Sequence, residues 1–573
     1  MIFGKKKSVN KSGYSLSELP KKDQSIIRAW CIYDWANSAF ATSAAAAIFP
    51  VYFVIAFQES FGDEMNILGI TFSGSSLWAF GVALSALVVA ITSPILGAIA
   101  DTYPLKKTFL KYYMLIGAGF TILSFFSAYV ASSWSWLIGC YFLANIGFAG
   151  ANVFYNSLLP SLADSKYVNQ ISTRGYAYGY IGGGLLLLVH LILIQAFYET
   201  NYSDLVTRLA IISVGLWWFG WSIWTLKVVP EPQIDTYVKK ESVVKLVLSA
   251  FGRLRQTFGE VRKYKYLFGF LIAFYIFNDG VQTVIGIAGA YGADVLGVQL
   301  IFNMITILIV QFVAAPGAVF FGWLADKLGT KESLIVALMG WIFVVAFVLG
   351  FAPLSLKDDR DFDYQIEFSL TENLYVVSSV PELLDTANAR EWKRRFHLEE
   401  GAMLSESQLI EFLQNVELQD SSKYSATVID ENTKVISKKH PTILSDNLLD
   451  RWPSFLRSVL WEPLSISIGY QWLILGVFSG VVLGGSQALA RACFSMMTPI
   501  KKSAEFFGFY AFTMKAASVI GPLIYVAAVN SSDEKVGVLI IWILIIAGTL
   551  LLSTVNVREG MKVAELENSA SKK

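Results

Sequence analysis

Apolar residues in this chain gather in long uninterrupted blocks that are separated by polar connections. A helix needs roughly 20 apolar residues to cross the hydrocarbon core of a bilayer, and each block reaches that length. The blocks lie near 29–57, 76–99, 109–131, 136–159, 171–196 and 207–229, and then near 266–291, 300–324, 332–354, 469–490, 505–529 and 536–556. The pattern predicts an all-α membrane protein with twelve transmembrane helices in two six-helix bundles.

The composition agrees with this block pattern. Of the 573 residues, 55% are hydrophobic and only 16% are charged, whereas soluble domains carry about 25% charged residues. Lys and Arg number 45 and Asp and Glu 44, and this balance gives no indication of a nucleic-acid partner. We expect the partners to be a lipid bilayer and a small-molecule substrate, and we expect a monomer.

Lys and Arg are distributed unevenly among the polar connections. Cytoplasmic loops of membrane proteins carry an excess of these residues. Basic residues fill the tail 1–28, the loop after the second block and the central segment 230–265, whereas the loops at 58–75, 131–135, 197–206 and 292–300 contain none. The asymmetry predicts that both termini, including the tail 558–573, are cytoplasmic. We expect the protein to reside in a bacterial inner membrane.

A long polar insertion, residues 355–465, separates the ninth and tenth blocks, and the loop parity predicts that it lies on the non-cytoplasmic side. Its residue patterns predict a small α+β domain. The predicted elements are a strand at 363–370, helices at 381–396 and 405–416, and a hairpin at 424–437. The insertion divides the C-terminal bundle into 266–354 and 466–557, whereas the N-terminal bundle spans 29–229.

The central segment 230–265 contains a predicted amphipathic helix around 243–261. We interpret this basic segment as a linker that lies on an anionic membrane leaflet.

The same short motif follows the second and the eighth block. In each copy a glycine precedes an aspartate by four residues, and basic residues follow. The glycine allows close helix approach, and the aspartate can cap a helix or pair with a basic residue. One copy would be an ordinary basic turn, but two equivalent copies predict an internal repeat that forms cytoplasmic gates. The gate residues are Gly97, Asp101, Lys106 and Lys107, and Gly322, Asp326, Lys327, Gly329 and Lys331.

The twelve blocks, the basic central segment and the paired motif resemble the major facilitator superfamily, although Pro104 replaces a usual glycine in the first copy. Five further stretches resemble its vacuole-effluxer-like branch, which is related to the autophagy-linked vacuolar amino-acid exporters. They are 33–40 (YDWANSAF), 172–183, 275–283, 484–491 and 506–510. The resemblance implies the major facilitator fold and secondary transport of small solutes, with amino-acid export as the best-known activity. It does not extend to residues 355–465.

Two ionisable residues lie deep inside apolar blocks. Asp279 is roughly 20 Å and Lys515 about 15 Å from the start of its block. Such groups cost a few kcal/mol each in a bilayer and usually face a cavity or a partner. An Asp279–Lys515 pair would neutralise both charges. It is either a static structural pair or a coupling site, in which a carboxylate that gains and loses its partner carries a proton.

The first block carries Asp34 with Asn37 one turn further along the same face. Asp34 is a helix cap or a partner of Arg174, or it faces a central cavity. The first and seventh blocks each carry an Asp and an Asn after a Tyr, and this parallel favours the cavity. Three asparagines that share one face of the fourth block line a hydrated path or bond between helices: Asn145, Asn152 and Asn156.

Further polar groups lie in the second half of the chain. Asn278, Gln282 and Gln487 would shape a polar cavity. Arg491 would either bind a substrate carboxylate bidentately or lie at an interface. We interpret His190 as a structural histidine.

The sequence contains no nucleotide-binding loop, metal-ligand cluster or catalytic triad. We therefore expect neither enzymatic activity nor a cofactor, with a proton gradient as the candidate energy source. The sequence predicts a secondary transporter that exports an amino acid or a similar small zwitterion. The alternatives are proton-coupled uptake of another metabolite and a transporter-like receptor that uses residues 355–465.

Overall fold

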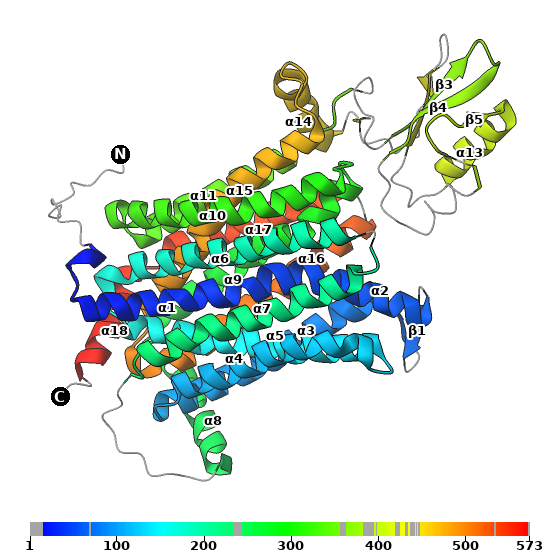
Figure 1. The fold of residues 1–573 in the computed structure, drawn as a ribbon. Coiled ribbons are helices and arrows are strands. Elements are labelled where there is room, and N and C mark those ends of the chain that lie inside the picture. Colours follow the sequence, from blue (N-terminus) through cyan, green and yellow to red (C-terminus); the bar gives the residue numbers. More distant parts are fainter. Residues whose placement is uncertain are drawn as a thin grey trace, which may run out of the picture.

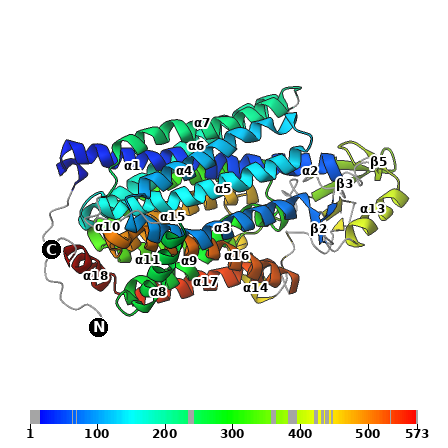
Figure 2. The same cartoon turned by 90° about the horizontal axis from the view of Figure 1, so that it is seen from below.

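The fold is given by a computed structural model. It describes residues 15–62, 64–67, 70–198, 200–232, 243–355, 363–381, 395–396, 398–418, 425–429, 434–435, 442, 444, 447–531 and 534–570. In these residues, twelve helices are long and apolar enough to cross a membrane. Six precede the central segment and six follow it, which confirms the predicted all-α membrane architecture. The long helices run side by side in both views (Figures 1 and 2).

The N-terminal bundle begins with a long span in which a π-helical stretch, Phe40–Ile48, joins α1 to α2. A short hairpin, which the hydropathy pattern did not indicate, connects α2 to α3; its antiparallel strands are β1 (Glu64–Ile67) and β2 (Ile70–Ser73). The helices are α1 (Lys21–Ala39), α2 (Phe49–Phe61), α3 (Gly74–Thr102), α4 (Lys106–Leu123), α5 (Ser133–Leu158), α6 (Val168–Phe197) and α7 (Ser203–Val228).

The predicted amphipathic helix of the central segment is confirmed as α8 (Val243–Gly259). It packs against α3, where Ala250 is buried with Ala98 and Ile99. The C-terminal bundle consists of α9 (Lys265–Asp294), α10 (Leu300–Leu328), α11 (Thr330–Val348), α15 (Ile468–Met496), α16 (Ser503–Ser531) and α17 (Glu534–Thr554), and α18 (Val557–Ala570) follows it.

Helices α10 and α15 approach so closely that their backbones touch. A Cβ atom at Gly484 of α15 would lie 2.7 Å from the backbone nitrogen of Ala318, and one at Gly317 of α10 would lie 2.6 Å from the carbonyl oxygen of Val481. Glycine is required at both positions because the opposing atoms belong to the backbone and cannot rotate away.

The insertion carries a five-stranded sheet with the order β5-β4-β3-β6-β7. β3 (Asp363–Ser369) pairs in parallel with β6 (Ser425–Ile429), and the other neighbours are antiparallel. The predicted strand, second helix and hairpin are confirmed as β3, α13 and β6–β7, whereas the predicted helix 381–396 lies almost wholly outside the described residues. The remaining elements are β4 (Leu374–Ser379), β5 (Met403–Leu404), α13 (Glu406–Leu418), β7 (Lys434–Val435) and α14 (Leu448–Leu456).

The insertion lies at one end of the bundles, whereas α18 and the start of α1 lie at the other (Figure 1). We call the end with α18 and the start of α1 the terminal face, and the opposite end the insertion face. At the terminal face, α3 packs on α16 and α6 packs on α10, so that helices of the two bundles meet there.

Candidate functional site

A cavity of about 200 Å³ lies between the two bundles. Its lining comes from α1, α3, α5 and α6 on one side and from α15 and α16 on the other. Acidic and basic side chains both line the cavity. Asp34 belongs to the N-terminal bundle, and Arg491 and Lys515 belong to the C-terminal bundle. The asparagines that line it are Asn37, Asn152 and Asn156. The structure therefore brings together Asp34, Asn37, Arg491 and Lys515 of the predicted site.

Arg491 enters a buried polar pocket of the opposite bundle. Its Nη1 atom donates to Asp34 Oδ2 at 3.0 Å and to Asn156 Oδ1 at 3.1 Å. Its Nε and Nη2 atoms donate to the hydroxyl and the carbonyl oxygen of Ser172 at 3.0 and 2.8 Å. The guanidinium also lies over the rings of Tyr176 and Trp30, with centroid distances of 4.1 and 5.0 Å, an arrangement that attracts a cation. The contacts favour the interface alternative for Arg491.

The predicted Asp34–Arg174 pair does not form, because Arg174 is exposed. The next residue of α6, Gly175, faces the ion pair instead, and a Cβ atom there would lie 2.7 Å from Asp34 Oδ2. Successive side chains of a helix point about 100° apart. The rotation that brings Gly175 to Asp34 therefore turns Arg174 away.

The predicted Asp279–Lys515 pair does not form either. Asp279 is buried between α9 and α16, where its Oδ1 atom accepts the backbone N–H of Gly521 at 2.8 Å. The absence of a side chain at Gly521 lets the carboxylate reach the backbone, since a Cβ atom there would lie 2.8 Å from it. Lys515 lies six residues earlier on α16 and lines the cavity, whereas Asp279 is not part of the described lining.

A polar cluster adjoins Asp279 inside the C-terminal bundle. The side-chain Oδ1 atom of Asn278 accepts from Gln487 at 3.1 Å and from Gln282 at 3.5 Å. These residues contact one another, but they lie outside the described lining of the cavity that they were predicted to shape.

In the N-terminal bundle, Asn37 donates to Asn152 at 2.8 Å inside the cavity. Asn145 instead donates to Ser85 of α3 at 2.7 Å, so the asparagine face combines both predicted roles. His190 has a serine hydroxyl at each ring nitrogen, at 2.6 and 2.7 Å, as a structural histidine requires.

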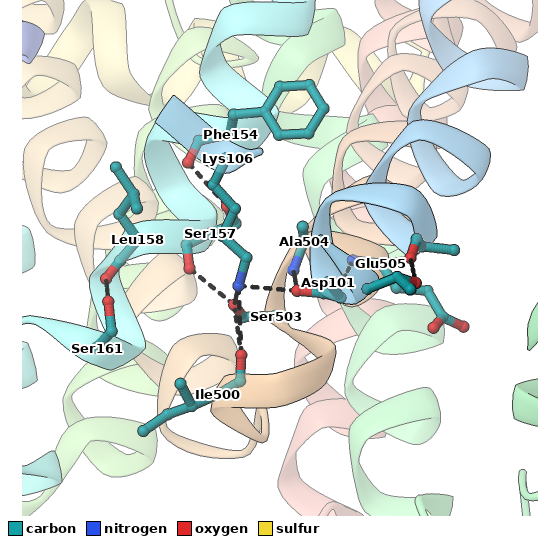
Figure 3. A network of polar contacts seen from close by, with 12 residues as sticks. Asp101, Lys106, Phe154, Ser157, Leu158, Ser161, Ile500, Ser503, Ala504 and Glu505 are labelled. Carbon is teal, nitrogen blue, oxygen red and sulfur yellow. Dashed lines mark hydrogen bonds and ion pairs between the residues drawn. The ribbon is translucent and has the colours of Figure 1, made fainter. Parts of the chain in front are cut away.

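The first gate motif joins the two bundles at the terminal face (Figure 3). The Asp101 carboxylate accepts the backbone N–H groups of Ala504 and Glu505 at 3.1 and 2.7 Å, and a carboxylate is favoured at such a helix N-terminus. Lys106 pairs with Asp101 at 2.8 Å and donates to the Ser503 hydroxyl at 2.6 Å. The motif thus binds α3 and the start of α4 to the start of α16.

Two further acidic residues lie in this region. Glu231 accepts the backbone N–H groups of Lys106 and Lys107 at 2.8 and 2.7 Å and so caps α4; its burial raises the pKa of its carboxyl, which these donors oppose. Glu505 is buried beside Asp101. Sequence reasoning missed Glu505 because it lies at the edge of an apolar block, where charged residues are common.

The second gate motif reaches across the bundles through its aspartate. Asp326 accepts from Gln170 of α6 at 2.8 Å, and Gly322 packs against Thr173, whose hydroxyl would lie 2.6 Å from an added Cβ atom. α10 ends at Gly329, whose φ of +106° favours glycine.

The basic residues of this second copy bind within their own bundle. Lys331 donates to the carbonyl oxygens of Ser553 and Val555 at 2.6 and 2.8 Å, and Lys327 lies 3.7 Å from the centre of the Trp323 ring. The second motif is therefore not a copy of the ion pair in the first.

The family model described as vacuole effluxer Atg22 like matches residues 22–168, 163–381 and 459–565. The chain belongs to this Atg22-like family. No resemblance was expected over 355–465, but the match includes 355–381 and 459–465, and only its gap, 382–458, agrees with that expectation. The match and the fold together make the Atg22-like chain a multi-pass membrane transporter of the major facilitator type.

Among curated relatives, the Atg22-like chain is 31% identical over 321 residues to an uncharacterized MFS-type transporter, YxiO, of Bacillus subtilis, covering 56% of this chain and 72% of the relative. It is 21% identical to autophagy-related protein 22 of Saccharomyces cerevisiae, covering 95% and 94% of the two chains.

Solved structures with the same fold include a bacterial homologue of the iron transporter ferroportin in an outward-facing state. Its TM-score is 0.54 at 11% identity, and the match covers 93% of the Atg22-like chain and 99% of the other. The proton:xylose symporter XylE also has a TM-score of 0.54, at 12% identity, with 95% and 98% covered.

Proposed function

We propose that this Atg22-like protein is a secondary active transporter that exports amino acids, or similarly small zwitterions, by alternating access. The observation that carries the proposal is the central cavity, which has charges of both signs and lies between two bundles that meet at the terminal face. Efflux is supported by the description of the family as vacuole effluxers. The amino-acid class is supported by the placement of Asp34 and Lys515 on opposite sides of the cavity.

Alternating access requires the contacts at the terminal face to break together. Among them are the Asp101 cap on α16, the Gln170–Asp326 hydrogen bond and the insertion of Arg491 beside Asp34. Each of them joins the N-terminal bundle to the C-terminal bundle. When they break, the cavity opens toward the terminal face and loads solute there.

The terminal face is the cytoplasmic one in this proposal, because the tail 1–28 and the central segment are rich in Lys and Arg. The Bacillus relative supports a bacterial cell membrane as the location.

A counterflow assay tests the proposed function. The purified protein is reconstituted in proteoliposomes loaded with an unlabelled amino acid, and the uptake of the labelled amino acid is followed across the proteinogenic set. At least one amino acid should accumulate transiently above the level of protein-free vesicles. If no amino acid shows counterflow, the proposed function is wrong.

Replacement of Asp279 tests the proposed coupling to protons. The Asp279 carboxylate is buried and accepts a hydrogen bond from the backbone N–H of Gly521. Because an uncompensated charge is costly inside a membrane, we expect a proton to neutralise this carboxylate during the transport cycle. With Asp279→Asn, accumulation driven by a pH gradient should fall to the level of equilibration, whereas counterflow without a gradient continues.

The exposed Asp164 at the terminal face provides the control, since Asp164→Asn should change neither assay. Undiminished accumulation by Asp279→Asn would show that the proton travels elsewhere.

A further inference from the structure

Within the part of the chain that the structure describes, Lys515 differs from the other cation of the cavity in having no polar partner. Arg491 donates to Asp34, Asn156 and Ser172 and is covered by aromatic rings. Among the described residues, by contrast, the Lys515 ammonium has neither a hydrogen bond nor an ion pair. It lines the cavity from the middle of a membrane span, where an uncompensated charge is costly.

A second donor lines the same cavity from α16, five residues before Lys515. The Tyr510 side chain lines the cavity and is 2% exposed, and its hydroxyl has no hydrogen-bond partner among the described residues. Its ring is stacked on Phe274 with a centroid distance of 4.5 Å and also contacts Phe494. The hydroxyl is therefore held in place rather than free to seek a donor or acceptor elsewhere. Buried hydroxyls are normally paired, and Tyr510 lines the cavity, so its hydroxyl is a candidate donor to a bound solute.

The opposite wall of the cavity presents acceptors. Asp34 carries a carboxylate there, one oxygen of which accepts from Arg491. Asn37 and Asn152 carry amide oxygens, and that of Asn152 accepts from Asn37. The cavity thus has cationic and hydroxyl donors on α16 and acceptors on α1 and α5. This polarity matches a molecule that has a carboxylate at one end and an ammonium group at the other.

We propose that Lys515, assisted by the Tyr510 hydroxyl, binds the carboxylate of the transported solute, and that Arg491 instead holds the terminal face closed. An ammonium is a compact point charge that can meet a carboxylate from several directions, which suits a solute that enters from one face and leaves by the other. The inference rests on the proposed function and narrows it, because every substrate must then carry a free carboxylate. A solute whose carboxylate is masked should be excluded.

The native protein provides the first test, which needs no variant. The amino acid that gives the largest thermal shift is compared with its own methyl ester, which keeps the ammonium group and the side chain but lacks the charge on the carboxyl. The ester should bind at least about tenfold more weakly, as expected for the loss of a hydrogen-bonded charge pair. Equal binding of acid and ester would overturn the inference.

Variants then assign the effect to Lys515. With Lys515→Met, the affinity for the acid should fall by about tenfold or more and the affinity for the ester should change little, so that the preference disappears. Tyr510→Phe should reduce the preference partly, and Lys515→Arg should restore it partly. Lys562→Met, at an exposed position of α18, is the matched control and should behave as the native protein.

The outcomes separate the two levels of the proposal. A preference for the acid that survives Lys515→Met but is lost with Arg491→Lys would place the carboxylate at Arg491 and overturn the inference alone. If the native protein neither binds nor transports any amino acid, both the proposed function and the inference are wrong.

Discussion

An alanine at position 97 should hold the terminal face open and reduce transport by about ten- to hundredfold, the equivalent of the roughly 1–3 kcal/mol that overpacking costs. A Cβ atom at Gly97 would collide with the carbonyl oxygen of Ala504 and lie 2.8 Å from the backbone nitrogen of Glu505. Both are backbone atoms of α16, so the collision is relieved only if α3 and α16 move apart. The separation also removes the N–H donors from Asp101.

Cysteine labelling measures this opening. The three native cysteines are buried, so Ala511→Cys in the cavity lining provides a single reactive thiol. With Gly97→Ala, a membrane-impermeant maleimide applied from the terminal face should label it much faster. Gly139→Ala is the matched control, because a Cβ atom at that position meets no atom within 4 Å. Unchanged labelling together with normal transport would show that α3 and α16 do not close the cavity.

Asparagine at position 34 should destabilise the protein by about 3–5 kcal/mol, the usual effect of removing one partner from a buried ion pair. Arg491 would remain in its pocket, with a side chain only 3% exposed, but without a counter-charge. The melting temperature of the purified protein should fall sharply, and transport should be lost because the terminal face no longer closes.

A double variant separates stability from transport. Asp34→Asn combined with Arg491→Gln removes both charges, so the melting temperature should recover largely while transport stays low. Asp164, whose side chain is 79% exposed, provides the control. Asp164→Asn should change the free energy of unfolding by no more than about 0.5 kcal/mol, so the melting temperature should stay close to that of the native protein. If Asp34→Asn alone melts like the native protein, the ion pair does not join the bundles.

The architecture could be predicted from the sequence because long apolar blocks and basic loops are signals that need no tertiary information. The first gate motif could also be predicted from the sequence alone, because Gly97 and Asp101 recur as Gly322 and Asp326 in the second half of the chain. Amphipathic α8 and strand β3 followed from local periodicity. The short β1–β2 hairpin did not, because strands of four residues carry too little pattern.

Charge partners could not be predicted, because they depend on the rotation of each helix. A single step along α6 decides whether Gly175 or Arg174 meets Asp34. Asp279 reaches the backbone of α16 only because position 521 is a glycine. The sequence supplied the charges of the cavity, but the tertiary packing selected Arg491 as the partner of Asp34.

The glycine-mediated approach of α10 and α15 constrains how the terminal face can open. Because their backbones touch near Gly317 and Gly484, neither helix can slide or tilt without carrying the other. α10 bears Asp326 and α15 bears Arg491, and both residues reach from the C-terminal bundle into α6. The two helices therefore move as one rigid unit. The contacts of Asp326 and Arg491 with α6 break in a concerted way, because a movement that frees one side chain also displaces the other.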